Sequence, residues 1–229
     1  MSDVPYAYSE GVAGNSILNP YCRACDRARS EIVPMHRFFA GFTWDVPLGR
    51  KHAFGQNLPS WLNAIVGNWE ISSTIRTRTG LGLTPNYTGA DPSNTNTFTG
   101  RPDVIRDPNL PRDQRNPDHW YDVSAFAVPP ANAGRFGNAG RNLVNGPPAF
   151  RMNAGVFKFI PLHEKLRMVV SVTSNNVLNH PDYSWGRPPG STNPVNASNA
   201  GFLTNLYEDI GQREWSYTRF VFFNVGFEF

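Results

Sequence analysis

The sequence predicts an all-β fold of antiparallel strands. Five segments alternate between apolar and polar residues, and a period of two residues indicates a strand with one apolar and one polar face. The 229 residues include 20 glycines and 20 prolines, which favour turns and loops. Aromatic residues make up 13% of the chain, and these residues suit strands. Together these observations indicate strands joined by turns and long loops.

Each predicted strand is about as long as a tilted strand that crosses a bilayer, roughly 9–11 residues. In the last of them, the odd positions from Val221 to Phe229 are apolar, whereas Asn224 and Glu228 face the other way. Charged residues of the other segments, such as Glu70, Arg76 and Arg167, also fall on the polar face. The predicted strands are residues 36–46, 68–78, 149–159, 166–178 and 217–229.

The connections between these strands alternate in length. A tight turn at 161–164 and a moderate link at 47–63 contrast with two long excursions, at about 79–148 and 179–216. Short turns on one side and long loops on the other are typical of an outer-membrane β-barrel, whose long loops are extracellular. The alternation predicts that the last strand ends at the periplasmic side. The alternative is a soluble β-sandwich with two large insertions.

Composition and termini restrict the function classes. No run of about 18 apolar residues is present, so no transmembrane helix is predicted. The first residues, MSDVPYAYSE, lack the features of a signal peptide, so either the protein is not exported or the chain is a piece of a longer one. The net charge of +3 comes from scattered basic residues, which does not indicate a nucleic-acid partner.

Five phrases carry a family resemblance. They are HRFFAGFTWDVPLG (36–49), VGNWEISSTIRTRTGLGLTP (66–85), RPDVIRDPNL (101–110), WYDVSAFAVPPANAGRFGNAGRNLVNGPP (120–148) and NNVLNHPDY (175–183). In this order, from about residue 19 to the end, the chain resembles the C-terminal barrel portion of TonB-dependent outer-membrane transporters, particularly the Oar-like group with a carboxypeptidase-regulatory-like domain. The phrase SVTSNN (171–176) departs from the acidic and aromatic residues usual there, which weakens inference about the lumen lining.

The resemblance implies a barrel of about 22 strands around a plugged lumen. Five strands cannot close such a barrel, so residues 1–229 are expected to form the C-terminal part of one barrel domain, without the plug and the N-terminal strands. The implied location is the bacterial outer membrane. The implied function is uptake of an unidentified ligand by a TonB-dependent receptor. The alternative function is that of a soluble or surface-attached β-sandwich that mediates binding or adhesion.

The resemblance also implies partners and an assembly signal. The partners are the TonB–ExbB–ExbD system, reached through the missing N-terminal part, the barrel-insertion machinery and outer-membrane lipid. The final aromatic residue, Phe229, resembles the signal that the barrel-insertion machinery reads.

Cys22 and Cys25 form a CxxC motif just before the first predicted strand. A small disulfide, free thiols and metal ligands all remain open for this motif. A zinc site needs further ligands, and the chain has no other cysteine. On the orientation above the motif lies outside the cell, which favours the disulfide, and no metal site is predicted.

No catalytic motif is present, so an enzyme is not predicted. The five histidines lack metal-ligand spacing, and neither a nucleophile elbow nor a phosphate loop occurs. The ligand-binding candidates are Glu70, Arg76 and Arg78 on the polar strand face and Trp120 and Tyr121 in the first long loop. The loop aromatics could stack on a ligand, but packing of the loops on themselves is favoured.

Acidic residues in the first long loop, Asp91, Asp103 and Asp107, offer oxygen atoms to a cation. Calcium binding there lacks the EF-hand spacing, and ordinary turn chemistry is favoured. No cofactor is predicted.

Overall fold

The computed structural model describes residues 22–29, 33–50, 52–163, 166–184, 194–203, 205–206 and 218–229. Contacts divide the chain into two compact units. The sheet unit comprises residues 38–77, 150–181 and 208–229, and the loop unit comprises 1–37, 78–149 and 182–207. In the described part, no helix is both long and apolar enough to span a membrane.

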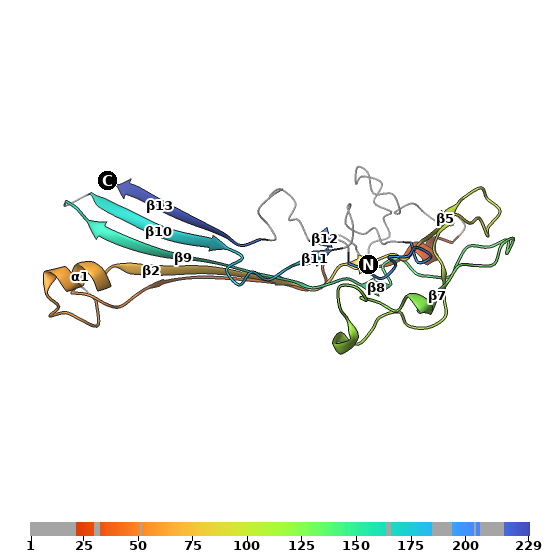
Figure 1. The fold of residues 1–229 in the computed structure, drawn as a ribbon, viewed down its shortest axis with the longest axis horizontal. Coiled ribbons are helices and arrows are strands. Elements are labelled where there is room, and N and C mark those ends of the chain that lie inside the picture. Colours follow the sequence, from red (N-terminus) through yellow and green to blue (C-terminus); the bar gives the residue numbers. More distant parts are fainter. Residues whose placement is uncertain are drawn as a thin grey trace. The chain divides into compact units, whose positions relative to one another are not determined.

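The sheet unit contains one five-stranded sheet (Figure 1). Its strands are β1 (Arg37–Asp45), β2 (Trp69–Arg78), β9 (Ala149–Pro161), β10 (Arg167–Asn175) and β13 (Phe220–Glu228), hydrogen-bonded in that order. Strand β10 runs antiparallel to both β9 and β13. All five predicted strands are confirmed. Among the described residues the sheet is open, with β1 and β13 at its edges.

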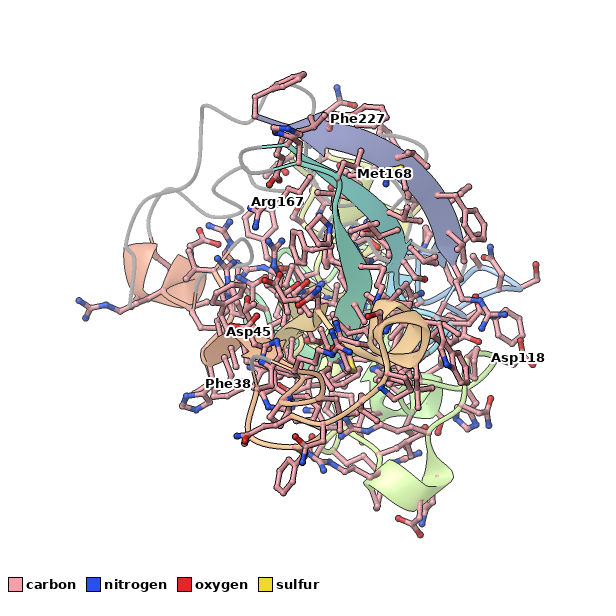
Figure 2. The ribbon with its side chains drawn as sticks, turned by 90° about the vertical axis from the view of Figure 1, so that its left-hand side faces the viewer. Phe38, Asp45, Asp118, Arg167, Met168 and Phe227 are labelled. Atoms are coloured by element: carbon pink, nitrogen blue, oxygen red, sulfur yellow. A yellow bond between two sulfur atoms is a disulfide. The ribbon has the colours of Figure 1, made fainter. Side chains whose placement is uncertain are left out.

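The register of the sheet separates its two faces. Met168 lies opposite Phe227, and Val170 lies opposite Val225, so apolar residues meet on one face. Figure 2 shows Met168 and Phe227 on these neighbouring strands. On the other face Ser171 lies opposite Asn224. Alternation along the strands therefore produces two chemically different surfaces.

The link between β1 and β2 contains a short helix, α1 (Ser60–Val66), which was not predicted. Asn63 N donates to Pro59 O at 3.0 Å and Gly67 N donates to Asn63 O at 2.9 Å, so the helix begins after a proline and ends at a glycine. Seven residues make about two turns, too few for a helical period to stand out from the sequence.

The loop unit is folded rather than irregular. Its short strands pair antiparallel as β3 with β8, β4 with β5, β6 with β7 and β11 with β12. The short strands and 3-10 helices (η) of this unit are η1 (Arg23–Asp26), β3 (Gly82–Leu83), β4 (Tyr87–Thr88), β5 (Thr99–Gly100), β6 (Asp103–Val104), η2 (Arg112–Gln114), η3 (Val123–Ala125), β7 (Phe126–Ala127), β8 (Val144–Asn145), β11 (Tyr183–Ser184) and β12 (Asn205–Leu206). Leu83, Tyr121, Phe126 and Val144 form its buried core.

Candidate functional site

One face of the sheet exposes large apolar side chains. Phe223 is 79% exposed, Val225 is 66% exposed and Phe38 is 57% exposed. Soluble monomeric proteins rarely leave such a patch uncovered, because contact between water and apolar surface is unfavourable. The exposed members at the alternating apolar positions are Phe38, Phe42, Trp44, Val156, Val172, Val221, Phe223, Val225 and Phe227. We call these residues the apolar face, and its chemistry is that of a lipid-facing strand surface.

Ser73 and Lys158 are polar residues on the apolar face, and each donates to backbone oxygen atoms. Ser73 is 4% exposed, and its Oγ donates to Asn153 O at 2.8 Å. Lys158 lies opposite Val170, and it is 8% exposed. Lys158 Nζ donates to Ile65 O at 3.2 Å and also to Gly67 O. Polar groups among apolar neighbours are tolerated when their hydrogen bonds are made within the protein.

The opposite face carries the charged residues of the sheet. The guanidinium of Arg76 lies 5.5 Å from the centre of the Phe39 ring, and that of Arg167 lies 4.7 Å from the centre of the Phe159 ring. Arg167 also forms an ion pair with Glu228 across the strand pair. Phe222 lies on this face too, opposite Thr173, so the face is mixed rather than purely polar. The sheet therefore keeps its charges away from the apolar face, Lys158 excepted.

Tryptophans gather at one end of the sheet. Trp44 stands near the end of β1 and Trp69 begins β2. Val46 N donates to Trp69 O at 2.8 Å, so the two tryptophans lie at the same end. Trp44 is 52% exposed, and aromatic girdles of this kind mark the membrane–water interface of outer-membrane barrels.

The structure places the five predicted ligand-binding residues in different surroundings. Arg76 and Glu70 belong to β2 in the sheet unit. The last residue of β2, Arg78, belongs to the loop unit, where its guanidinium donates to Thr79 O at 3.5 Å. Trp120 and Tyr121 both belong to the loop unit. Binding of a ligand by these residues stays a prediction.

The two loop aromatics take part in packing. Tyr121 is 1% exposed, and its ring meets that of Phe126 edge-on at 5.9 Å between centroids. Burial raises the pKa of Tyr121 to about 12. Trp120 is partly buried against the same core, and its Nε1 donates to Asn145 O at 2.8 Å. The Tyr121 ring therefore has no open face for stacking, in line with the packing role that the sequence favoured.

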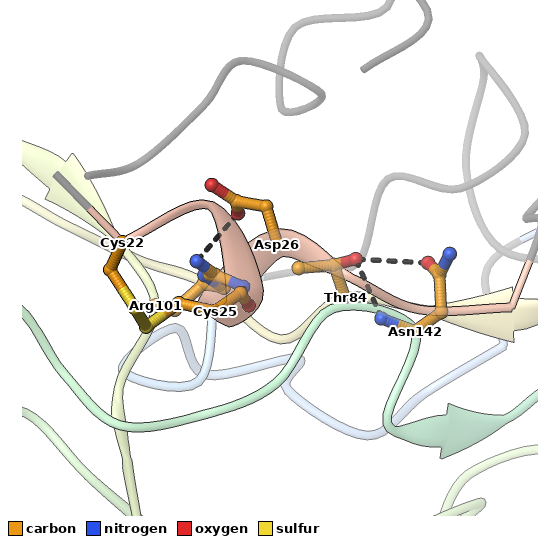
Figure 3. A network of polar contacts seen from close by, with 6 residues as sticks. All are labelled: Cys22, Cys25, Asp26, Thr84, Arg101 and Asn142. Atoms are coloured by element: carbon orange, nitrogen blue, oxygen red, sulfur yellow. Dashed lines mark hydrogen bonds and ion pairs between the residues drawn. A yellow bond between two sulfur atoms is a disulfide. The ribbon is translucent and has the colours of Figure 1, made fainter. Parts of the chain in front are cut away.

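A disulfide joins Cys22 to Cys25. Next to it, the buried guanidinium of Arg101 donates to Cys25 O at 2.9 Å and to Asp26 Oδ1 at 2.7 Å (Figure 3). Burial lowers the pKa of Arg101, while Asp26 acts in the opposite direction. Nothing in the spacing of Arg101 along the sequence predicted this ion pair.

A second group of contacts in Figure 3 centres on Asn142. Its backbone N donates to Thr84 Oγ1 at 3.0 Å, and its side-chain Nδ2 donates to Arg29 O at 2.7 Å. Arg29 in turn donates to Asn145 Oδ1 at 2.6 Å. Polar contacts of Cys25, Asp26 and Arg29 therefore attach residues 22–29 to the first long loop.

The three loop aspartates accept hydrogen bonds from other residues of the loop unit. Asp91 accepts from Ser93 Oγ at 2.8 Å and from Asn96 N at 2.7 Å. Burial acts to raise the pKa of Asp91, but these hydrogen bonds outweigh it and the pKa is lowered. Asp107 accepts from Asn109 N at 2.9 Å, which is ordinary turn chemistry. No cluster of three potential metal ligands occurs among the described residues.

Asp103 binds the Arg135 guanidinium through both carboxylate oxygens, at 2.8 and 2.7 Å. It also accepts a hydrogen bond from Asn138 N at 3.1 Å. The hydrogen bonds from Arg135 lower the pKa of Asp103, more than its partial burial raises it. This carboxylate thus ties two parts of the loop unit together.

Comparison with known proteins agrees with these surfaces. The family model of an outer membrane beta barrel domain matches residues 1–215, which is most of the chain. A search of curated proteins and a search of solved structures found no significant match. The matched region includes four of the five long strands, with the two-faced sheet described above. The chain belongs to the family of outer membrane beta barrel domains and is an outer-membrane protein.

Proposed function

We propose that this chain is the barrel part of a TonB-dependent receptor that takes up a ligand across the outer membrane. The observation that carries the proposal is the folded loop unit. A barrel that served only as an anchor would need no loop with its own buried core, whereas a receptor needs a preformed surface that recognises a ligand. The family match supports the membrane location, and the motif resemblance described above supports the coupling to TonB.

In this proposal the loop unit faces the outside of the cell and makes the first contact with the ligand. The polar face of the sheet, with Arg76 and Glu70, lines the path inward. The residues of this chain bind and orient, and no chemical step is assigned to them. Energy for uptake comes from the TonB–ExbB–ExbD system acting through a plug.

Comparison of two deletion strains tests the proposal. One strain lacks the gene for this protein and the other lacks TonB, and both grow in the same complex medium. Mass spectrometry of the medium then identifies solutes that the parent strain removes. We expect at least one solute that both deletions leave behind. Uptake that stays normal without the protein, or that needs the protein but not TonB, would show that it is not an energy-coupled receptor.

A matched control separates transport from loss of the barrel. The substitution Arg76→Ala removes a charged side chain from the polar face. The substitution Val225→Ala shortens a side chain on the apolar face. We expect the first to reduce uptake and the second to leave it unchanged, with equal amounts of both variants in the outer membrane.

A further inference from the structure

The link between β1 and β2 exposes apolar side chains where a soluble protein would expose polar ones. Trp61 is 67% exposed and Ile65 is 59% exposed, and they stand four residues apart on α1. Residues with this spacing share one face of a helix. Ala64 is exposed on the same helix, whereas Leu62, Asn63 and Val66 are half-buried. The outer face of α1 is therefore apolar along most of its length.

The helix is joined to the apolar face of the sheet. Val225 lies opposite Val170, and Val170 lies opposite Lys158, so all three share the apolar face. Lys158 Nζ donates to Ile65 O at 3.2 Å and lies 5.0 Å from the centre of the Trp69 ring. Trp69 Nε1 also donates to Ile65 O, at 2.8 Å. These contacts hold the end of α1 over the surface that faces lipid, rather than over the polar face.

Lys158 has a clear role in this arrangement. The last carbonyl groups of a helix have no partners within the helix and carry partial negative charge, which a lysine satisfies. The helix in turn covers the ammonium group, so a charge can stand in an apolar row of the sheet. In the sequence, Lys158 interrupts the apolar series Phe150, Met152, Ala154 and Val156, and that interruption is the signal of a local partner.

The rest of the link holds the helix in a fixed position. Asn63 Oδ1 accepts a hydrogen bond from Arg50 N at 2.8 Å, and Arg50 Nε donates to Leu58 O at 2.6 Å. Gly49 has a φ of 120°, and a Cβ there would lie 2.9 Å from Asn63 Oδ1, so only glycine fits comfortably. Phe54 of this link is 64% exposed, which extends the apolar surface beyond α1.

We propose that helix α1 (Ser60–Val66) forms a lipid-interface anchor. The outer face of α1 lies at the boundary between headgroups and acyl chains, in the leaflet at the end of the sheet where β1 ends. Lipid is the occupant because the surface continues the apolar face, which the outer-membrane location places against the bilayer. Tryptophan and aliphatic side chains on a short helix suit this depth. The inference depends on the membrane location and not on transport.

Spin labelling of the intact protein tests the anchor. Both native cysteines are joined in the disulfide, so a nitroxide on Ala64→Cys is specific in this chain. The protein is reconstituted in vesicles of phosphatidylethanolamine with a minor share of phosphatidylglycerol. We expect high access of oxygen and low access of a water-soluble nickel complex at Ala64→Cys. Labels on Val225→Cys and Gln56→Cys give the references for hydrocarbon and for water.

Two results would overturn the inference. Access of the nickel complex equal to that at Gln56→Cys would place α1 in water. A strongly immobilised label that neither reagent reaches would show that protein, not lipid, covers the helix. Quenching by brominated lipid gives a second readout without a label, since Trp61→Phe should remove part of the quenched tryptophan emission. Equal quenching in the two proteins would likewise contradict a lipid contact at Trp61.

Discussion

The two units of this chain differ in where they place their large hydrophobic side chains. Among the described residues, the buried hydrophobic side chains, such as Leu83 and Tyr121, all belong to the loop unit. Most of the exposed large hydrophobic side chains, such as Phe223 and Val225, belong to the sheet unit. The loop unit is thus folded as a protein in water, whereas the sheet unit is folded for a solvent that is itself apolar. One chain can therefore bury its hydrophobic side chains in a part that contacts water and expose them in a part that contacts lipid.

The largest expected effect comes from removing a core side chain of the loop unit. The substitution Tyr121→Ala deletes a buried ring, and loss of a large core side chain costs about 3–5 kcal/mol. We expect proteases to cut the loop unit much faster while the barrel stays resistant to SDS without heating. Tyr121→Phe, which keeps the ring, is the control. Equal protection of the Ala variant and the wild type would mean that the loop unit does not depend on this core.

The second largest expected effect comes from placing a charge on the apolar face of the sheet unit. Arginine in place of Phe223, near the middle of β13, puts a charge against hydrocarbon at a cost of about 2–4 kcal/mol. Asn224→Arg, one residue away on the opposite face, should cost much less. Urea unfolding of the intact protein from vesicles measures both. If the two arginines destabilise equally, the assignment of faces is wrong.

The smallest effect is a difference in pH dependence. The pKa of Asp103 is lowered in the folded state, so its ion pair stabilises the loop unit above the ordinary aspartate pKa and is lost as pH falls through the lower folded value. We expect pepsin to cut the loop unit faster below about pH 4, with less change in Asp103→Asn. The described part of the apolar face has no carboxylate, so its lipid contact should not change over this range. Identical acid profiles of variant and wild type would exclude this contribution.

The sheet could be predicted because its physical cause is local. A strand with one apolar face repeats every two residues, and β1, β2, β9, β10 and β13 all carry that repeat. The repeat also assigned Phe223 to the apolar face and Arg76 to the polar face. Residue order is enough here because the solvent on each face acts on every second residue.

The loop unit could not be predicted in the same way. Its core joins Leu83, Tyr121 and Val144, which stand far apart in segments without a period. Its paired strands are two residues long, too short to leave a pattern. The ion pair of Arg101 with Asp26 spans 75 positions, and only the folded chain brings the two together. Helix α1 was missed because its outer face is apolar, so the usual contrast between two helix faces is absent.

The contacts of residues 22–29 and 194–203 with the first long loop have a consequence for the order of folding. Arg29 reaches Val144 across 115 positions, and Asn196 binds Thr88 across 108. Contacts at such separations carry a high cost of loop closure and form late. The loop unit therefore needs chain from before β1, from between β2 and β9 and from after β10. We expect the loop unit to finish folding only after β1, β2, β9 and β10 have been synthesised. A completely folded loop unit would therefore indicate that those strands are in place.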